Sequence, residues 1–199
     1  DPSWSRGLGD VYKRQIINMM NISVIGAGYV GLITGIGFAK LNHQVSIVDL
    51  NDDLIKNLNE NRPPFYEPEL VDYLNDSNIR NNLFFSTSYQ KSINENTDIV
   101  FVCVQTPTDP DTGKTKTDYI SSVLTELKKI ERFNFIVCIK STIKATLVEK
   151  ISNEIDLDYK KIIFNPEFLR EGSAFYDFFN PDRIVIGGSD QKGLNQCTE

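Results

Sequence analysis

The sequence predicts an α/β fold: a doubly wound parallel sheet with helices on both faces. Short apolar runs suited to buried strands alternate along the chain with segments of helical period. A glycine turn in G-x-G-x-x-G spacing follows the first of these runs directly. Polar residues follow the ends of several later runs, which is where sheets of this kind bind their ligands. Together these three observations indicate a Rossmann-like arrangement.

The first unit of the predicted fold is a strand, a turn and the start of a helix. Ile22 to Ile25 is short and mostly apolar, as expected of a strand buried on both faces. Gly26 permits a tight turn, Gly28 lets a pyrophosphate approach the backbone, and Gly31 lets the helix pack closely on the sheet. The helix is expected to stop at Asn42, because asparagine tolerates the left-handed conformation that often follows a helix.

This unit predicts a dinucleotide site. Unpaired N–H groups and the positive end of the helix dipole favour the pyrophosphate at the turn, which Ala27, Tyr29 and Val30 complete. Asp49, at the end of the second strand, can accept hydrogen bonds from the ribose hydroxyls and would repel the extra phosphate of NADP. NAD is therefore the expected cofactor. A lone G-x-G-x-x-G run can also be a flexible loop, so the prediction depends on the strand before it, the helix after it and the acid.

Composition excludes several classes of protein. The chain has 199 residues, of which 40% are hydrophobic and 24% charged, and this suits one large globular domain or a domain and a fragment. No apolar run approaches the roughly 18 residues of a membrane helix, and a net charge of −6 argues against a nucleic-acid partner.

Cysteine and histidine usage bears on location and on metals. Cys103 and Cys138 lie in apolar runs, and an odd number of unpaired cysteines is typical of the reducing cytoplasm. The one histidine, His43, is expected to be structural. With no cysteine cluster beside it, we expect no metal site.

The ends of the chain are expected to lie outside the domain. Residues 1–19 show no helical or strand period and no secretory h-region, and Asp10 to Gln15 resembles a translated sequencing adapter. We expect a non-native or disordered leader there, with a disordered basic arm as the alternative. The NAD-binding domain is then expected at 20–188, with 189–199 a truncated or uncertain tail.

Further strands and helices are expected after Asp49. Helices are expected after a cap at Asn51, at Leu70 to Leu74, after a cap at Asp118 and from Leu147 to Ile155. Strands are expected at Leu83 to Phe85, Asp98 to Val104, Phe135 to Ile139, Ile162 to Phe164 and Ile184 to Ile186, with a long loop from Gln105 to Thr117.

Polar residues follow three of these strands. Thr106 follows one strand, Ser141 and Thr142 follow the next, and Glu167 follows a third. Because parallel strands bind ligands beyond their carboxyl ends, these side chains are expected to converge on the nicotinamide end of one crevice.

The segment Asn165 to Gly188, NPEFLREGSAFYDFFNPDRIVIGG, resembles the signature of the nucleotide-sugar dehydrogenases, the UDP-glucose/GDP-mannose dehydrogenase family. Its FLREGSA and NPDRIVIG portions are most similar to the members that oxidise UDP-glucose. Other motifs occur in the family's order along the chain: GAGYVG, Asp49, FYEPEL at Phe65 to Leu70, VQTPTD at Val104 to Asp109, and KST at Lys140 to Thr142. The resemblance therefore covers the family's NAD-binding domain, from Met20 to Gly188.

The resemblance implies an activity. Members of this family oxidise a sugar 6-hydroxyl to a carboxylate by two hydride transfers to NAD, the second through a thioester on a cysteine. Glu167 would then position and deprotonate the water that hydrolyses the thioester, as a general base. Thr142 would hydrogen-bond in the same network. A homo-oligomer is implied for the full-length protein, with a nucleotide sugar as the substrate and with neither nucleic acid nor membrane as a partner.

The resemblance also implies two sets of binding residues. Those that would border the NAD are Val104, Gln105, Thr106, Pro107, Thr108, Ser141, Thr142 and Glu171. Those that would line the nucleotide-sugar site are Glu167, Phe168, Leu169, Arg170 and Glu171. Taken alone, these residues allow another interpretation, in which Asn165 caps a helix that begins at Pro166 and the two glutamates favour its positive end.

The sequence departs from the family at several positions. Leu54 stands where a basic residue is usual, with Lys56 as the candidate substitute, and Glu69 stands where a glycine is usual. The family's Pro and Gly after the Ser-Thr pair are replaced within Lys144 to Thr146. The nucleophilic cysteine, lysine and asparagine of the family have no counterpart up to residue 199, and Cys197 does not match the nucleophile's glycine-rich surroundings.

The leading hypothesis is therefore the N-terminal portion of an NAD-dependent dehydrogenase that oxidises UDP-glucose to UDP-glucuronate. One alternative is a dehydrogenase of GDP-mannose or UDP-N-acetylmannosamine. Another is a stand-alone NAD-binding module without catalysis, in which the site carboxylates would be relics.

Overall fold

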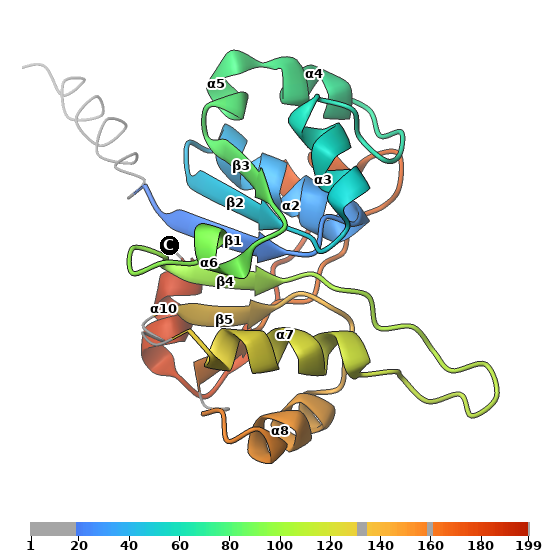
Figure 1. Cartoon of the computed structure of the whole chain (residues 1–199), viewed down its shortest axis with the longest axis vertical. Helices are drawn as coiled ribbons and strands as arrows, with labels where there is room; N and C mark the ends of the chain where they lie inside the picture. The colour runs from blue at the N-terminus through green and yellow to red at the C-terminus, as the bar shows by residue number, and fades with distance from the viewer. Residues whose placement is uncertain (1–18, 131–134, 159–160, 199) are drawn as a thin grey trace, which may run out of the picture.

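The computed structural model describes residues 19–130, 135–158 and 161–198 (Figure 1). Most of the expected leader therefore lies outside the described residues. The described residues form one sheet in the order β3-β2-β1-β4-β5-β6-β7, in which β1 to β6 are parallel and β7 is antiparallel. The strands are β1 (Asn21–Ile25), β2 (Gln44–Val48), β3 (Leu83–Ser86), β4 (Ile99–Val102), β5 (Ile136–Ile139), β6 (Ile162–Phe164) and β7 (Gly187–Gly188).

Helices cover both faces of the sheet, which confirms the doubly wound α/β prediction (Figure 1). The helices packed in the core on one face are α2 (Tyr29–Lys40), α3 (Asp52–Asn59), α4 (Leu70–Asn75), α5 (Ser77–Arg80), α9 (Ala174–Phe179) and α10 (Gln191–Thr198). Those on the other face are α6 (Tyr89–Ser92), α7 (Asp118–Lys128) and α8 (Ala145–Glu154).

Strand β4 shows how one short apolar run serves both faces. Ile99 and Phe101 belong to the core beneath α2, while Val100 and Val102 belong to the core beneath α7. Because successive side chains of a strand point to opposite faces, a central parallel strand is mostly apolar along its whole length. The strand order reverses between β1 and β4, and the carboxyl ends of these neighbours form the edge at which doubly wound sheets bind ligands.

Several local predictions are confirmed. Helix α2 ends at Lys40, and Asn42 adopts a left-handed φ of 67°. The Asn51 side chain accepts a hydrogen bond from the Leu54 N–H and so caps α3. His43 is buried, and its Nδ1 accepts a hydrogen bond from the Met20 N–H at 3.2 Å, in a structural role.

The last expected strand is wrong in position. Ile184 to Ile186 are irregular, with Ile184 67% exposed, and the strand is instead Gly187–Gly188. Gly187 pairs with Phe164, so the chain enters β7 at the carboxyl edge of β6 and runs antiparallel to it. An apolar run next to a strand cannot by itself reveal from which edge the chain returns.

Two helix predictions also need correction. The cap of α7 is Thr117, which makes no side-chain cap bond, and Asp118 is the first helical residue, where its charge favours the helix dipole. The interpretation of Asn165 as a helix cap is wrong, because residues 165–170 are irregular and α9 begins only at Ala174. Within the described residues, no helix is long and apolar enough to cross a membrane.

Candidate functional site

The glycine turn after β1 is a closely packed backbone structure with one open position. A Cβ at Gly26, which has a φ of 100°, would lie 2.8 Å from the Cys103 carbonyl oxygen. A Cβ at Gly31 would lie 1.8 Å from the Gly26 carbonyl oxygen. Gly28 is exposed, and a Cβ there would meet nothing within 4 Å. The turn therefore needs two glycines for its own packing, and the third leaves free space for a ligand.

The helix that begins at this turn suits an anion. The N-cap of α2 is Gly28, which has no side chain to accept hydrogen bonds from the first N–H groups of the helix. The first turn of α2 contains no acidic residue. Helix N-termini of this kind bind phosphate groups through free N–H groups and the helix dipole. Ala27 is buried beneath the turn, and Tyr29 and Val30 are half-buried beside it.

Asp49 contacts the turn itself. Its Oδ2 accepts a hydrogen bond from the Ala27 N–H at 2.8 Å, and its Oδ1 accepts one from the Asn51 N–H at 3.0 Å. Each carboxylate oxygen can accept a further hydrogen bond. Asp49 is half-buried and thus orders the turn while keeping acceptor capacity for a ribose hydroxyl.

A hollow of about 550 Å³ lies beside Asn51, lined also by Leu54 and by Arg62. The guanidinium of Arg62 donates to Asn57 Oδ1 at 3.1 and 2.8 Å. Lys56, the expected substitute for the missing basic residue, does not line this hollow. Sequence reasoning missed Arg62, because only the folding back of the loop after α3 brings it beside Leu54.

The loops after β4 and β5 meet, as predicted. Ser141 Oγ donates to the Val104 carbonyl oxygen at 2.6 Å, and Thr106 Oγ1 donates to the Thr142 carbonyl oxygen at 2.9 Å. Thr142 is exposed, as are Gln105, Pro107 and Thr108 farther along the first loop. The two hydroxyls thus join the segments that were expected to border the nicotinamide.

Glu167 follows β6 and is half-buried. Its Oε2 accepts a hydrogen bond from the Leu169 N–H at 3.1 Å. Burial raises the pKa of the Cys103 thiol to about 12, while the charge of Lys140 lowers it and the charge of Glu167 raises it. Lys140 Nζ donates to Asn165 Oδ1 at 3.0 Å and ties the start of this loop to β5.

Part of the 165–171 segment borders a cavity of about 520 Å³ on the α2 face of the sheet, with Phe168, Leu169 and Arg170 in its lining. Phe168 is 49% exposed. Arg170 pairs with Asp177 at 2.6 Å, and its hydrogen bonds lower the pKa of Asp177 to about 2. Three of the five residues expected to line the sugar site therefore border this cavity, although Arg170 already has an acidic partner, and Glu167 and Glu171 are not in its lining.

Glu67 is a site residue that sequence reasoning missed. It is 3% exposed and accepts hydrogen bonds from Tyr29, Gly172 and Ala174, next to the exposed Glu171. Its place in the FYEPEL motif was the available signal, but a motif does not show which carboxylate is buried.

The cysteines differ in their surroundings. Cys103 and Cys138 are buried and free, as expected. Contact with Cys197 and burial raise the pKa of Cys138. Cys197, in the segment expected to be a truncated or uncertain tail, lies in α10 and packs against the core. Within the described residues, no group of three or more His, Cys, Asp or Glu side chains is arranged to hold a metal ion.

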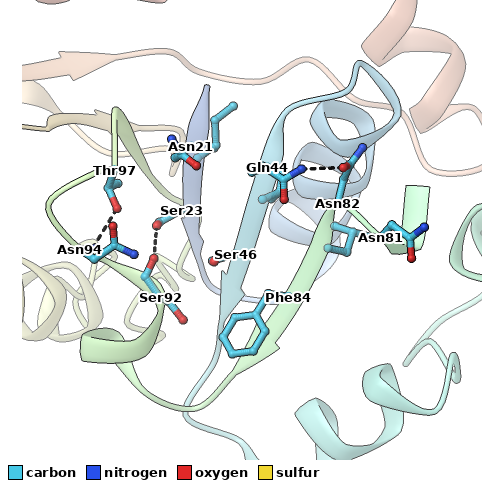
Figure 2. A pocket seen from close by; sticks show the side chains of 13 residues that line it. Asn21, Ser23, Gln44, Ser46, Asn81, Asn82, Phe84, Ser92, Asn94 and Thr97 are labelled. Atoms are coloured by element: carbon cyan, nitrogen blue, oxygen red, sulfur yellow. Dashed lines mark hydrogen bonds between the residues drawn. The ribbon is translucent and has the colours of Figure 1, made fainter. Parts of the chain in front are cut away.

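A separate hollow of about 280 Å³ lies at the amino ends of β1, β2 and β3 (Figure 2). Its side chains are mainly amides and hydroxyls, and Ser23 Oγ donates to the Ser92 carbonyl oxygen at 2.6 Å (Figure 2). Because the glycine turn is at the opposite end of β1, this hollow is not part of the candidate cofactor site.

Comparison with known proteins agrees with this geometry. Residues 20–199 match a family model described as the UDP-glucose/GDP-mannose dehydrogenase family, NAD binding domain. UDP-glucose 6-dehydrogenase YwqF of Bacillus subtilis is 35% identical over 188 residues, covering 90% of this chain and 42% of that protein.

Two solved structures have the same fold over most of the chain. A UDP-glucose dehydrogenase from Pyrobaculum islandicum superposes with a TM-score of 0.79 at 35% identity, covering 90% of this chain and 43% of that one. A GDP-mannose dehydrogenase from Pseudomonas aeruginosa superposes with a TM-score of 0.77 at 29% identity, covering 89% and 43%. The chain thus spans less than half the length of each of these three proteins.

Proposed function

This chain belongs to the UDP-glucose/GDP-mannose dehydrogenase family and carries its NAD-binding domain, and on that premise we propose that it serves the oxidation of UDP-glucose to UDP-glucuronate. The observation that carries the proposal is the arrangement at the carboxyl edge of the sheet. There the open Gly28 position, the joined loops at Thr106 and Thr142, and Glu167 follow β1, β4, β5 and β6.

NAD fits the residues at this edge. The pyrophosphate would lie at the N-terminus of α2, where a Cβ is absent at Gly28 and no acidic side chain opposes it in the first helical turn. Asp49 would accept hydrogen bonds from the ribose hydroxyls with the acceptor capacity left after its two backbone bonds. When bound, NAD supplies the hydride acceptor for the oxidation.

The catalytic roles follow the chemistry of the side chains. Conversion of a primary alcohol to a carboxylate removes two hydrides and adds one oxygen from water, so a base must take a proton from that water. In our proposal this base is Glu167, whose charge acts on Cys103 after β4, and Thr142, on the loop joined to Thr106, hydrogen-bonds in the same network. Phe168 to Glu171 would contact the nucleotide sugar.

UDP-glucose is the preferred substrate on similarity. Relatives named UDP-glucose 6-dehydrogenase include those of Bacillus subtilis at 35% and Rhizobium meliloti at 37% identity. GDP-mannose is the second candidate, because a dehydrogenase of that sugar superposes with a TM-score of 0.77.

The test is a substrate comparison with the domain joined to the remaining portion of the Bacillus subtilis relative. We expect NADH absorbance to rise with UDP-glucose by two NADH per sugar, with little rise from GDP-mannose or UDP-N-acetylmannosamine. Glu167→Gln should lower this rate by about 100-fold or more, as expected for loss of a general base. Faster turnover of GDP-mannose than of UDP-glucose would contradict the assignment of the sugar.

A further inference from the structure

Glu67 is a buried carboxylate with donors from two distant parts of the chain. Its Oε1 accepts from the Ala174 N–H at 2.9 Å, while its Oε2 accepts from the Gly172 N–H at 2.9 Å and the Tyr29 hydroxyl at 2.8 Å. These donors lie 107, 105 and 38 residues away in sequence. A buried charge is costly unless its oxygens are hydrogen-bonded, so these contacts act as a unit.

The protonation states favour the same arrangement. Burial by itself would raise the pKa of Glu67, but the N–H groups of Ala174 and Gly172 outweigh that effect and lower it. Burial, followed by the hydrogen bond to Glu67, raises the pKa of Tyr29. At neutral pH the glutamate is therefore an anion and the tyrosine remains a hydroxyl donor.

Each arm of this contact reaches a different part of the candidate site. Tyr29 is the first residue of α2, next to the open Gly28 position. Gly172, with a φ of 85°, and Ala174, the first residue of α9, end the loop that carries Glu171. Ser173 is the N-cap of α9 and makes no side-chain cap bond, so Glu67 supplies from another segment the acceptor that the helix start lacks.

We infer that Glu67 is a positioning residue that couples the two halves of the site, which are the cofactor turn (residues 26–31) and the sugar loop (residues 165–174). Its carboxylate contacts the turn through Tyr29 and the loop through Gly172 and Ala174, and so holds the two in one relative arrangement. This role rests on the proposed function, in which NAD lies against the turn and the sugar against 167–171. Glu67 itself touches neither ligand. Binding of NAD, which would order the cofactor turn, would then also order the sugar loop.

Three substitutions separate coupling from simple stabilisation. Glu67→Gln keeps the size of the side chain but replaces one acceptor oxygen with a donor, so it cannot satisfy all three partners. Tyr29→Phe removes the hydrogen bond from the cofactor turn to Glu67, together with the 3.3 Å hydrogen bond from the Tyr29 hydroxyl to the Arg170 carbonyl oxygen. Asp177→Asn is the matched control, because Asp177 also accepts from the sugar loop, at the Arg170 N–H at 2.9 Å, and acts on Glu67 through its charge alone.

NAD affinity of the 199-residue chain and of each variant is measured by calorimetry, with a thermal melt of each. Glu67→Gln is expected to weaken NAD binding by about tenfold, Tyr29→Phe by a similar factor, and Asp177→Asn by less than about twofold. Glu67→Gln and Tyr29→Phe break the same coupling. The variant that carries both changes should therefore bind NAD about as tightly as either single variant. Amide exchange at Gly172 and Ala174 should slow when NAD binds to the unmutated chain and to Asp177→Asn, but not to Glu67→Gln.

Equal NAD affinity of Glu67→Gln and the unmutated chain, with only a lower melting temperature, would overturn the inference and leave a structural residue. An equal loss in Asp177→Asn would overturn it too, since order in the sugar loop alone would then suffice. If Glu67→Gln does not fold, Tyr29→Phe decides: unchanged NAD affinity overturns the coupling, and a tenfold loss supports it. Failure of the unmutated chain to bind NAD would overturn both this inference and the proposed cofactor site, and is recognised before any substitution is made.

Discussion

The glycine turn and the 165–174 loop are the two halves of the candidate site, and they are held in different ways. The turn is closed by backbone packed on backbone, with the Gly26 N–H bonded to the Val48 carbonyl oxygen at 2.7 Å. The loop has no regular structure until Ala174 and is held by the side chains of Glu67, Asp177 and Lys140. A structure made by backbone packing tolerates no added atom, whereas one made by side-chain contacts loses order gradually as contacts are removed.

The largest effect is expected at Gly31. In Gly31→Ala the new Cβ would lie 1.8 Å from the Gly26 carbonyl oxygen, and neither backbone can yield easily. We expect a loss of about 3 kcal/mol or more in the free energy of unfolding, equivalent to roughly 10 °C in Tm. Gly28→Ala is the control, because its Cβ meets nothing within 4 Å: its Tm should be unchanged while NAD binding weakens. Equal melting temperatures for the two variants would show that the turn is less rigid than its packing implies.

Asp49 provides the next largest effect, on the cofactor side of the comparison. Asp49→Ala removes a charged acceptor, and NAD affinity should fall by about 1–3 kcal/mol, roughly 5-fold to 150-fold. The unmutated chain should bind NAD more tightly than NADP, because the carboxylate repels a 2′-phosphate.

Calorimetry with both cofactors measures this preference. Asp52→Ala, an exposed acid in the first turn of α3, is the control and should leave both affinities unchanged. Equal binding of the two cofactors by the unmutated chain would refute the role of Asp49.

Glu69 lies two residues after Glu67, and its backbone is strained. It adopts a left-handed φ of 67° as the N-cap of α4, where the family usually has glycine. Its Oε2 accepts a hydrogen bond from the Tyr73 hydroxyl at 3.0 Å, which offsets part of that cost. Glu69→Gly should therefore raise the free energy of unfolding by about 1 kcal/mol in a urea melt. Glu69→Ala retains the strain and loses the hydrogen bond, so it should lower stability; a gain in the alanine variant would contradict this account.

The smallest effect is expected from low pH, which lowers the free energy of unfolding by protonating Asp177 beside the 165–174 loop. Arg170 and the backbone hydrogen bonds hold the pKa of Asp177 near 2, below its unfolded value of roughly 3.9. A lowered pKa contributes stability above the unfolded value, and that stability is lost as pH falls from about 4 to about 2. Urea melts of Asp177→Asn should show a weaker fall over this range than those of the unmutated chain. Parallel curves would mean that the ion pair contributes nothing to stability, as is common for exposed pairs.

Most of the fold could be predicted from the sequence, because its signals are local. The apolar runs of β1 and β4 have few alternatives in a sheet covered on both faces, and the glycine spacing indicates a tight turn that needs glycine at Gly26 and Gly31. The left-handed Asn42 and the Asn51 cap likewise follow from the chemistry of single side chains. The position of the last strand could not be predicted, because Ile184 to Ile186 are as apolar as a strand and only the return path of the chain leaves Ile184 and Val185 exposed.

The sequence by itself therefore determined the parallel sheet, the glycine turn and the acid after β2, since period, spacing and residue type are properties of neighbouring residues. Only the tertiary structure decided that Asp49 also bonds to the turn, that Arg62 rather than Lys56 lines the hollow beside Asn51, and that Glu67 joins Tyr29 to Ala174. The physical reason is that burial and long-range hydrogen bonds depend on which segments pack together. A carboxylate's surroundings, and so its role, exist only after the chain has folded.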